Sequence, residues 1–220
     1  MKVFKALIFD FDGTLAKSME DNYLAWKAAA FEHGAELLPE DYYPLEGTRV
    51  KELADWMNKK FDLNLDNPEQ LAEKKEAHYL ANHKFELYPG AATLVRSLRH
   101  SAIPIAMVTA GSRRRITGSA PADFLAQFDA IVTAEDTQKG KPDPDPYLKG
   151  AEKLGVKIEE CLVIENAPLG VASAKRAGAF CIALCTTLSG NHLSRADKIV
   201  QSMEELLASG MLARLFNREL

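Results

Sequence analysis

Polar residues follow several short apolar runs of this sequence, at the point where each run ends. In chain order they are Asp10 and Asp12, then Thr109, then Glu165 and Asn166, with Lys141 in a loop between the last two groups. Carboxylate and amide oxygens suit a hard divalent cation, while a hydroxyl and an ammonium can hold phosphoryl oxygens. These residue types together predict a site that holds a phosphate group beside Mg²⁺.

Five continuously apolar runs precede or separate these residues, and helical patterns lie between them. The runs cover residues 6–9, 103–108, 130–132, 161–164 and 180–184. Apolar runs without alternation are typical of parallel strands that are buried on both faces. Strands that alternate with helices predict an α/β fold with a doubly wound parallel sheet. Because the carboxyl ends of parallel strands meet at one edge, we expect the polar residues to converge there.

Helix boundaries are marked by proline and glycine. Asp145 resembles an N-cap followed by Pro146 at the first helical position, and Gly155 is expected to end that helix. Pro168 and Gly178 bracket a second helix in the same way.

Residues 16–85 interrupt the alternation, because they contain amphipathic helical patterns and no clear strand. Trp26 falls at core spacing within the first of these helices, and Gly34 is a plausible stop. We therefore expect a core domain formed by residues 1–15 and 86–220, with residues 16–85 as a helical cap domain. The insert leaves the carboxyl end of the first strand, where open α/β sheets bind their ligands.

Composition excludes several other functions. The chain has 220 residues and a net charge of -4, which gives no reason to expect nucleic acid or acidic membranes as partners. No apolar run approaches the roughly 20 residues that span a bilayer, and the N-terminus does not resemble a signal peptide. The three cysteines have no Cys-x-x-Cys spacing and the five histidines no zinc-binding frame. We expect a cytoplasmic enzyme with small buried cysteines.

Each polar residue also has a simpler explanation when it is taken alone. An Asp-Gly pair is often only a turn, Thr109 can simply end a strand, and Lys141 can be a solvated loop charge. An EF-hand loop does not fit, because its frame needs a preceding helix, a further oxygen ligand and a Glu at the loop end. The joint occurrence of the residues in one chain order favours a shared site.

Four motifs resemble those of the haloacid dehalogenase superfamily, in the subgroup of β-phosphoglucomutase and related small-molecule phosphatases. They are DFDGTL at residues 10–15, VTAGS at 108–112, GKPDP at 140–144 and VIENAPLGV at 163–171. The resemblance covers nearly the whole chain. It implies that Asp10 is a nucleophile that forms an aspartyl-phosphate and that Asp12 is the acid and base.

The resemblance also implies ligands for the cofactor and the phosphate. Mg²⁺ would bind Asp10, the backbone carbonyl of Asp12 and the fourth motif, Glu165 and Asn166. Thr109, Ala110 and Lys141 would hold the phosphoryl group, and Lys141 is preferred to Lys139 because the family's proline follows it. An aspartate at position 12 favours a phosphate ester over the substrates of dehalogenases and phosphonate-cleaving relatives.

Three positions depart from the family pattern. Asn166 replaces a common second acid, which removes a charge from the metal site. Asn22 falls where β-phosphoglucomutase has a cap histidine, and Lys17 where an aspartate is common. In the Gly47-Thr48-Arg49 turn, Arg49 is either a substrate contact or a surface residue. The same two alternatives hold for the arginines at positions 113–115.

These features lead us to expect a Mg²⁺-dependent phosphatase that hydrolyses a small phosphorylated metabolite, with the insert as a lid. A sugar phosphomutase is the alternative within enzymes, and a catalytically quiet phosphometabolite-binding module is the alternative in another class. We expect no nucleic acid or membrane partner, and either a monomer or a small homo-oligomer.

Overall fold

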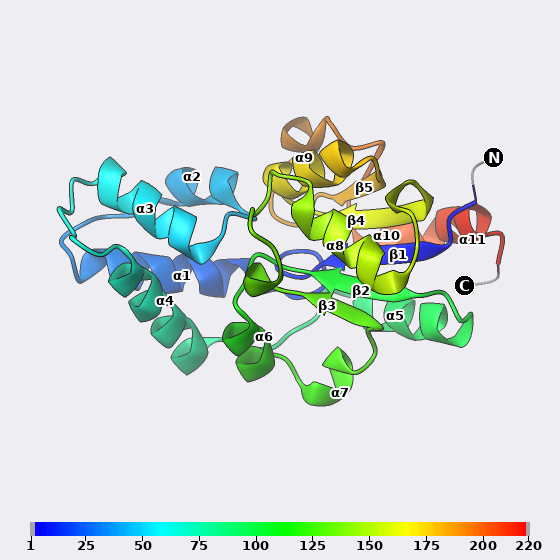
Figure 1. Cartoon of the computed structure of the whole chain (residues 1–220), viewed down its shortest axis with the longest axis horizontal. Helices are drawn as coiled ribbons and strands as arrows, with labels where there is room; N and C mark the ends of the chain where they lie inside the picture. The colour runs from blue at the N-terminus through cyan, green and yellow to red at the C-terminus, as the bar shows by residue number, and fades with distance from the viewer. Residues whose placement is uncertain (1–2, 219–220) are drawn as a thin grey trace.

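A six-stranded parallel sheet forms the centre of the molecule (Figure 1). The computed structural model describes residues 3–218, and the strand order is β3-β2-β1-β4-β5-β6. The strands are β1 (Ala6–Asp10), β2 (Ile105–Val108), β3 (Ala130–Val132), β4 (Cys161–Glu165), β5 (Phe180–Leu184) and β6 (Lys198–Val200). Leu7 lies opposite Ile105 of β2 and Leu162 of β4, so β1 is paired on both sides. All polar strand ends therefore lie along one edge.

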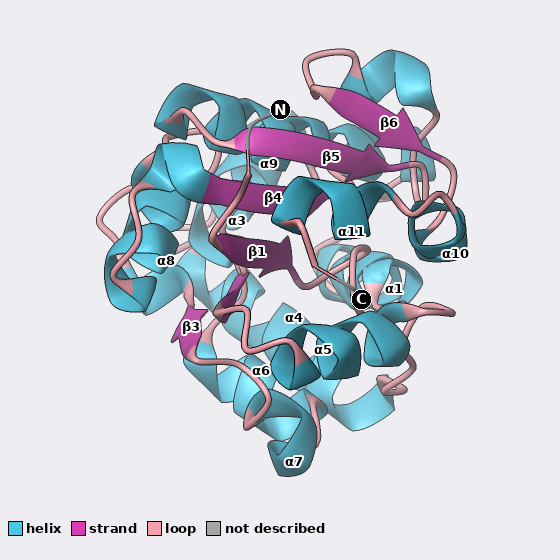
Figure 2. Cartoon of the chain, turned by 90° about the vertical axis from the view of Figure 1, so that its right-hand side faces the viewer, coloured by secondary structure: helices cyan, strands magenta, loops and turns pink. Residues whose placement is uncertain are grey.

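Successive residues of each strand point to opposite faces, and each face has its own apolar core. Leu7 and Phe9 belong to one core, and Ala6 and Ile8 to the other. The first face is covered by α5 (Ala91–His100), α6 (Arg113–Ser119), α10 (Met203–Ala208) and α11 (Met211–Phe216). The second is covered by α8 (Asp145–Leu154) and α9 (Pro168–Ala177), as Figure 2 shows. The predicted doubly wound α/β fold is thus confirmed.

The remaining core elements are short. They are α7 (Ala122–Leu125) and the 3₁₀ helices η2 (Ala134–Asp136), η3 (Ile158–Glu160) and η4 (Gly190–Leu193). Among residues 3–218, no helix is long and apolar enough to cross a membrane.

The five predicted strands are present, with differences at their ends. β2 begins at Ile105 rather than at residue 103, because the turn after α5 covers Ser101 and Ala102 and the next two residues are irregular. β6 was not predicted: it is a three-residue edge strand whose Lys198 and Ile199 are exposed, so it lacks an apolar run. The Asp145 cap prediction was wrong by one residue. Pro144 caps α8, and Asp145 is its first helical residue.

The glycine predictions are correct. Gly155 and Gly178 follow the last residues of α8 and α9 with φ values of +68° and +94°, a conformation that costs glycine little.

Residues 16–85 form helices that gather on one side of the sheet (Figure 1). They are α1 (Met19–Phe31), α2 (Pro39–Tyr42), the 3₁₀ helix η1 (Tyr43–Leu45), α3 (Val50–Lys60) and α4 (Glu69–Asn82). Their apolar side chains form a third core that includes the fully buried Trp26. Sequence patterns predicted α1, α3 and α4, but α2 and η1 are too short to show periodicity.

The chain enters and leaves this insert at adjacent points. Ala16 forms an antiparallel bridge with Leu87, and the amide of Lys17 donates to the carbonyl of Glu86. This pairing supports the expected boundaries at residues 16 and 85, although the division into two domains stays a prediction.

The central strands predict a large stability effect for a core truncation. Leu162 of β4 is fully buried, so Leu162→Ala should lower the free energy of unfolding by about 2–5 kcal/mol. Leu148→Ala is the matched control, because Leu148 is 42% exposed on α8 and should change it by less than about 0.5 kcal/mol. Urea denaturation of both variants checks this, and equal losses would contradict the assignment of the core.

Candidate active site

A sharp turn after β1 brings Asp10 and Asp12 to one cavity. The carbonyl of Phe11 accepts three backbone N–H groups within this turn. Gly13 adopts a φ of +84°, and a Cβ at this position would lie 2.2 Å from the side-chain nitrogen of Asn166. Glycine is therefore required both for the left-handed backbone and for the close approach of the β4 loop.

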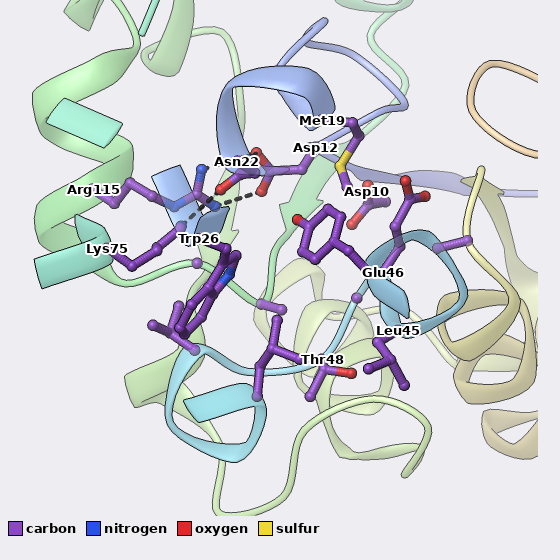
Figure 3. Close-up of a pocket in the computed structure, with 17 residues that line it drawn as sticks. Asp10, Asp12, Met19, Asn22, Trp26, Leu45, Glu46, Thr48, Lys75 and Arg115 are labelled. Atoms are coloured by element: carbon purple, nitrogen blue, oxygen red, sulfur yellow. Dashed lines mark hydrogen bonds and ion pairs between the residues drawn. The ribbon is translucent and has the colours of Figure 1, made fainter. Parts of the chain in front are cut away.

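The cavity lies between the carboxyl edge of the sheet and the insert, and it has a volume of about 50 Å³ (Figure 3). The core supplies Asp10, Asp12, Ala110, Gly111 and Arg115, and the insert supplies, among others, Asn22, Trp26, Tyr42, Glu46 and Lys75. Trp26 thus packs in the third core, as predicted, and also forms part of the cavity wall. A space of this size holds only about four water molecules.

Lys141 holds the side chain of Asp10, the candidate nucleophile, in place. Its ammonium lies 2.6 Å from Oδ1 of Asp10 and 2.6 Å from Oε1 of Glu165, and its side chain is 1% exposed. One ammonium is thus shared by two carboxylates. Burial raises the pKa of Asp10 to about 8, against the attraction of Lys141 and with added repulsion from Glu165. Burial would lower the pKa of Lys141, but the two carboxylates raise it above its ordinary value.

Glu165 is held by four donors. Oε1 accepts from Lys141 and from the hydroxyl of Tyr147 at 2.7 Å, and Oε2 accepts two backbone N–H groups of the loop that follows β4. A Cβ on Gly170 would lie only 1.6 Å from Oε1, so a glycine is required where α9 passes this carboxylate. This arrangement suits a residue that positions Lys141 better than a direct metal ligand.

Asp12 lies at the opposite end of the cavity and accepts five hydrogen bonds. Ser18 donates at 2.6 Å, Thr109 at 3.1 Å and Asn22 at 3.3 Å. Both terminal nitrogens of Arg115 contact its carboxylate, one of them at 2.9 Å. Burial opposes ionisation, but Arg115 and the other donors hold the pKa of Asp12 well below its usual range.

Arg115 is the one arginine of the 113–115 run that reaches this site. It is 2% exposed, its Nε has no hydrogen-bond partner, and its guanidinium lies against Gly111, where a Cβ would be 2.0 Å from Nη2. Arg113 instead pairs with Asp136 on the surface, and Arg114 is exposed. The helix-surface explanation therefore holds for two of the three.

Thr109 and Ala110 lie at the end of β2, as the strand pattern predicted. The Thr109 hydroxyl donates to Asp12 and accepts the backbone N–H of Gly111 at 3.0 Å, while Ala110 lines the cavity. The hydroxyl of Thr109 is thus placed beside Asp12, at the cavity that Asp10 also lines.

Two insert residues extend the polar end of the cavity. Asn22 of α1 is buried and accepts a hydrogen bond of 2.7 Å from Lys75 of α4. Lys75 is 2% exposed, and burial together with the nearby Arg115 lowers its pKa to about 8. Lys75 was missed from the sequence. It occupies the buried spacing Leu71-Lys75-Tyr79, and a lysine on the apolar face of a helix is the signal that could have identified it.

Two further residues singled out from the sequence lie outside this cavity. Arg49 donates to the carbonyls of Thr137 and Gln138 at 2.7 and 2.8 Å, and it lines a separate small pocket beside Lys141. It is half-buried and joins the insert to the core. Lys17 forms an ion pair with Glu86 where the chain enters and leaves the insert.

Asn166 and Glu46 form a contact between core and insert that the sequence did not suggest. The Asn166 amide accepts from Thr14 at 2.9 Å and donates to Oε2 of Glu46 at 3.2 Å. Glu46 also accepts from Thr187 at 2.8 Å, and its other oxygen is buried without a partner. Burial, together with repulsion from Glu165 and Asp10, raises the pKa of Glu46 to about 8, although the Thr187 hydrogen bond lowers it.

The residues at this end offer a small set of oxygen ligands for a hard divalent cation. Within residues 3–218, no three Asp, Glu, His or Cys side chains lie close enough to hold a metal by themselves. A magnesium ion here would therefore rely on Asp10 together with the backbone carbonyl of Asp12 and the Asn166 amide, which are acceptable oxygen ligands. The unpartnered buried oxygen of Glu46 is a separate sign that this end suits a cation.

Comparisons with known proteins agree with this architecture. Residues 4–178 match the family model described as haloacid dehalogenase-like hydrolase. The chain is 34% identical to hexitol phosphatase A of Escherichia coli, over 92% of this chain and 93% of that one. It is 29% identical to the β-phosphoglucomutase of Bacillus subtilis, over 92% of this chain and 91% of that one. The crystal structure of a hydrolase from Pseudomonas syringae has a TM-score of 0.84 and 27% identity, over 93% and 96%.

The chain therefore belongs to the haloacid dehalogenase-like hydrolases. Within them it is a phosphoric monoester hydrolase, with a phosphomutase as the alternative.

The raised pKa values at the Asp10 end predict an unusual pH dependence of stability. In EDTA, Asp10 and Glu46 keep protons in the folded protein up to about pH 8, whereas the unfolded chain loses them near its ordinary values of 3.8 and 4.5. The folded state binds more protons in this window, so its stability should fall as the pH rises from 5 to 8. Urea denaturation across that range measures it. Asp10→Asn should make the dependence shallower, and a rising or flat wild-type profile would contradict the prediction.

Proposed function

We propose that this enzyme is a Mg²⁺-dependent phosphatase that hydrolyses a small phosphorylated sugar or polyol through an aspartyl-phosphate on Asp10. The observation that carries this proposal is the placement of two carboxylates with opposite environments in one cavity. Asp10 is paired with a buried ammonium that phosphoryl oxygens can share, and Asp12 is surrounded by hydrogen-bond donors. A nucleophile and an acid/base need such separate environments.

In the first step, an Asp10 oxygen attacks phosphorus and the bond from phosphorus to the ester oxygen breaks. Asp12 gives a proton to the departing oxygen, so an alcohol leaves rather than an alkoxide. Lys141 and the Thr109 loop stabilise the negative charge on the phosphoryl oxygens. In the second step, Asp12 takes a proton from water, the water oxygen attacks phosphorus, and Asp10 is released with inorganic phosphate.

The contacts of Asp12 in this structure do not suit the first step, which needs a protonated carboxyl group. Bound to Arg115 at both oxygens, it stays ionised and cannot donate a proton. A productive complex therefore requires Arg115 to move from Asp12, and an anionic or hydroxyl-rich substrate provides new acceptors for the guanidinium.

Magnesium would be held by Asp10, the Asp12 carbonyl and Asn166, next to Lys141. When bound, it supplies charge that offsets the repulsion between an anionic nucleophile and an anionic phosphate. The raised pKa of Asp10 supports this need, because the nucleophile must be ionised at neutral pH.

The proposed substrate class rests on the cavity and the relatives. The relatives named above act, by their names, on phosphorylated hexitols and glucose. Asn22, Lys75 and Arg115 form a polar end that suits hydroxyl groups. Because the insert forms one wall of the cavity, we expect it to open for substrate to enter and then to close over the substrate and exclude water.

The likeness to β-phosphoglucomutase favours a mutase as the second candidate. A mutase returns the phosphoryl group to a bound sugar instead of to water. Release of inorganic phosphate measured beside sugar isomerisation, with and without a sugar bisphosphate, separates the two. If the protein hydrolyses no member of a broad phosphate-ester panel and no aryl phosphate, that result would favour the catalytically quiet binding module.

Removal of the nucleophile should abolish turnover. Asp10→Asn keeps the size of the side chain and a contact for Lys141, so we expect a folded protein with no detectable phosphate release. Thermal unfolding serves as the folding control. Retained activity in a folded variant would rule out the covalent mechanism.

Removal of the acid/base should depend on the leaving group. Asp12→Asn should slow hydrolysis of a hexitol phosphate by about 10²–10⁴-fold, because its alkoxide needs a proton. Hydrolysis of 4-nitrophenyl phosphate should be slowed much less in the phosphorylation step, since nitrophenolate leaves without one. Single-turnover kinetics with both esters measures that step, and an equal loss for both would contradict the role of Asp12.

A further inference from the structure

Glu46 is a carboxylate that the mechanism above does not use. It follows η1 in the insert and is 2% exposed, although it lies on a loop. Its Oε2 accepts hydrogen bonds from Thr187 and Asn166 of the core, whereas its Oε1 is buried and has no partner. Figure 3 shows the carboxylates of Glu46 and Asp10 at the same end of the cavity.

Charges at this end do not balance. Three carboxylates, Asp10, Glu165 and Glu46, face a single ammonium, Lys141, which is already bound to two of them. Arg115 and Lys75 lie at the other end, where they contact Asp12 and Asn22. Buried carboxylates persist when they are paired or coordinate a metal, so the Asp10 end is short of positive charge.

The contact with Asn166 indicates where that charge belongs. Oε2 of Glu46 accepts from the Asn166 amide, so the amide nitrogen lies toward Glu46 and the amide oxygen toward Thr14 in the turn after β1. Glu165 cannot replace the missing acid directly, because both its oxygens are taken by four donors. Besides Asp10, Glu46 is thus a carboxylate at this end with an oxygen, Oε1, that has no hydrogen-bond partner.

We propose that Glu46 supplies, from the helical insert, the carboxylate charge that Asn166 does not provide, and so completes the divalent-cation site beside Asp10. This inference rests on the proposed Mg²⁺-dependent function. The cation site is then shared between the core and the insert.

Sharing the site couples cation binding to the position of the insert. A cation that binds tighter when Glu46 is in place must stabilise the closed insert by the same free energy. Bound Mg²⁺ therefore holds the insert against the core, and opening of the insert weakens the hold on Mg²⁺. Thr187 and Asn166 position Glu46 for this role through the two bonds described above.

A double-mutant cycle tests the proposal by direct Mg²⁺ binding, measured by titration calorimetry. Glu46→Gln keeps the bonding shape of the side chain but removes its charge, and it should weaken Mg²⁺ binding by about 10–100-fold. Adding Asn166→Asp returns a carboxylate to the site, so the double variant should bind within about threefold of wild type. Glu52→Gln is the matched control, because Glu52 is an exposed acid of the same insert and its loss should leave binding unchanged.

Hydrogen exchange supplies a readout that needs no enzymatic activity. Saturating Mg²⁺ should slow exchange of the backbone amides of residues 42–49 in wild type, and should not do so in Glu46→Gln. Thermal unfolding in EDTA checks that each variant is folded.

The outcomes separate the inference from the proposed function. Unchanged Mg²⁺ binding in Glu46→Gln would overturn the inference while phosphatase activity stands. Weakened binding without rescue by Asn166→Asp would also overturn it, since Glu46 would then only latch the insert. The predicted cycle in a protein that hydrolyses no phosphate ester would support the inference and refute the function. Absence of Mg²⁺ binding in wild type would refute both the inference and the metal dependence.

Discussion

The candidate active site depends on one buried positive charge at the carboxyl edge of the sheet. Lys141 is the one ammonium bound to both Asp10 and Glu165, and it is almost completely buried. Glycine at position 170 lets Glu165 approach α9, and Glu165 in turn holds Lys141 beside the nucleophile. One positive charge cannot neutralise two buried carboxylates. The Lys141 ion pairs therefore leave a net negative charge at this edge of the sheet.

The two aspartates of the first motif are perturbed in opposite directions. The pKa of Asp10 is raised by burial, and that of Asp12 is held low by Arg115. Catalysis needs the reverse, an ionised nucleophile and a protonated acid. Under the proposed mechanism, a cation next to Asp10 would correct the first, and transfer of Arg115 to the substrate would correct the second.

The sequence predicted the core half of the site and little of the insert half. Asp10, Thr109 and Lys141 lie where apolar runs and the loop motif placed them, because strand ends are local features and parallel strands share an edge. Glu46 and Lys75 depend on how separate helices pack across the cavity, about 36 and 65 residues beyond Asp10 in the chain. Local pattern carries no information on such contacts, although the lysine on a buried helix face was a readable sign. The short strand β6 was missed for a related reason, since sheet pairing rather than its own sequence makes it a strand.

Asn166 shows why a departure from a motif has to be interpreted together with its surroundings. Taken alone, an amide in place of an acid indicates a weaker metal site. In the folded chain the same amide donates to Glu46 and accepts from Thr14, so it joins the insert, the β4 loop and the turn after β1. The two residues therefore act together, because their contact holds the insert loop against the β4 loop. Under the proposal that Glu46 completes the cation site, the carboxylate absent at position 166 would be supplied by the insert.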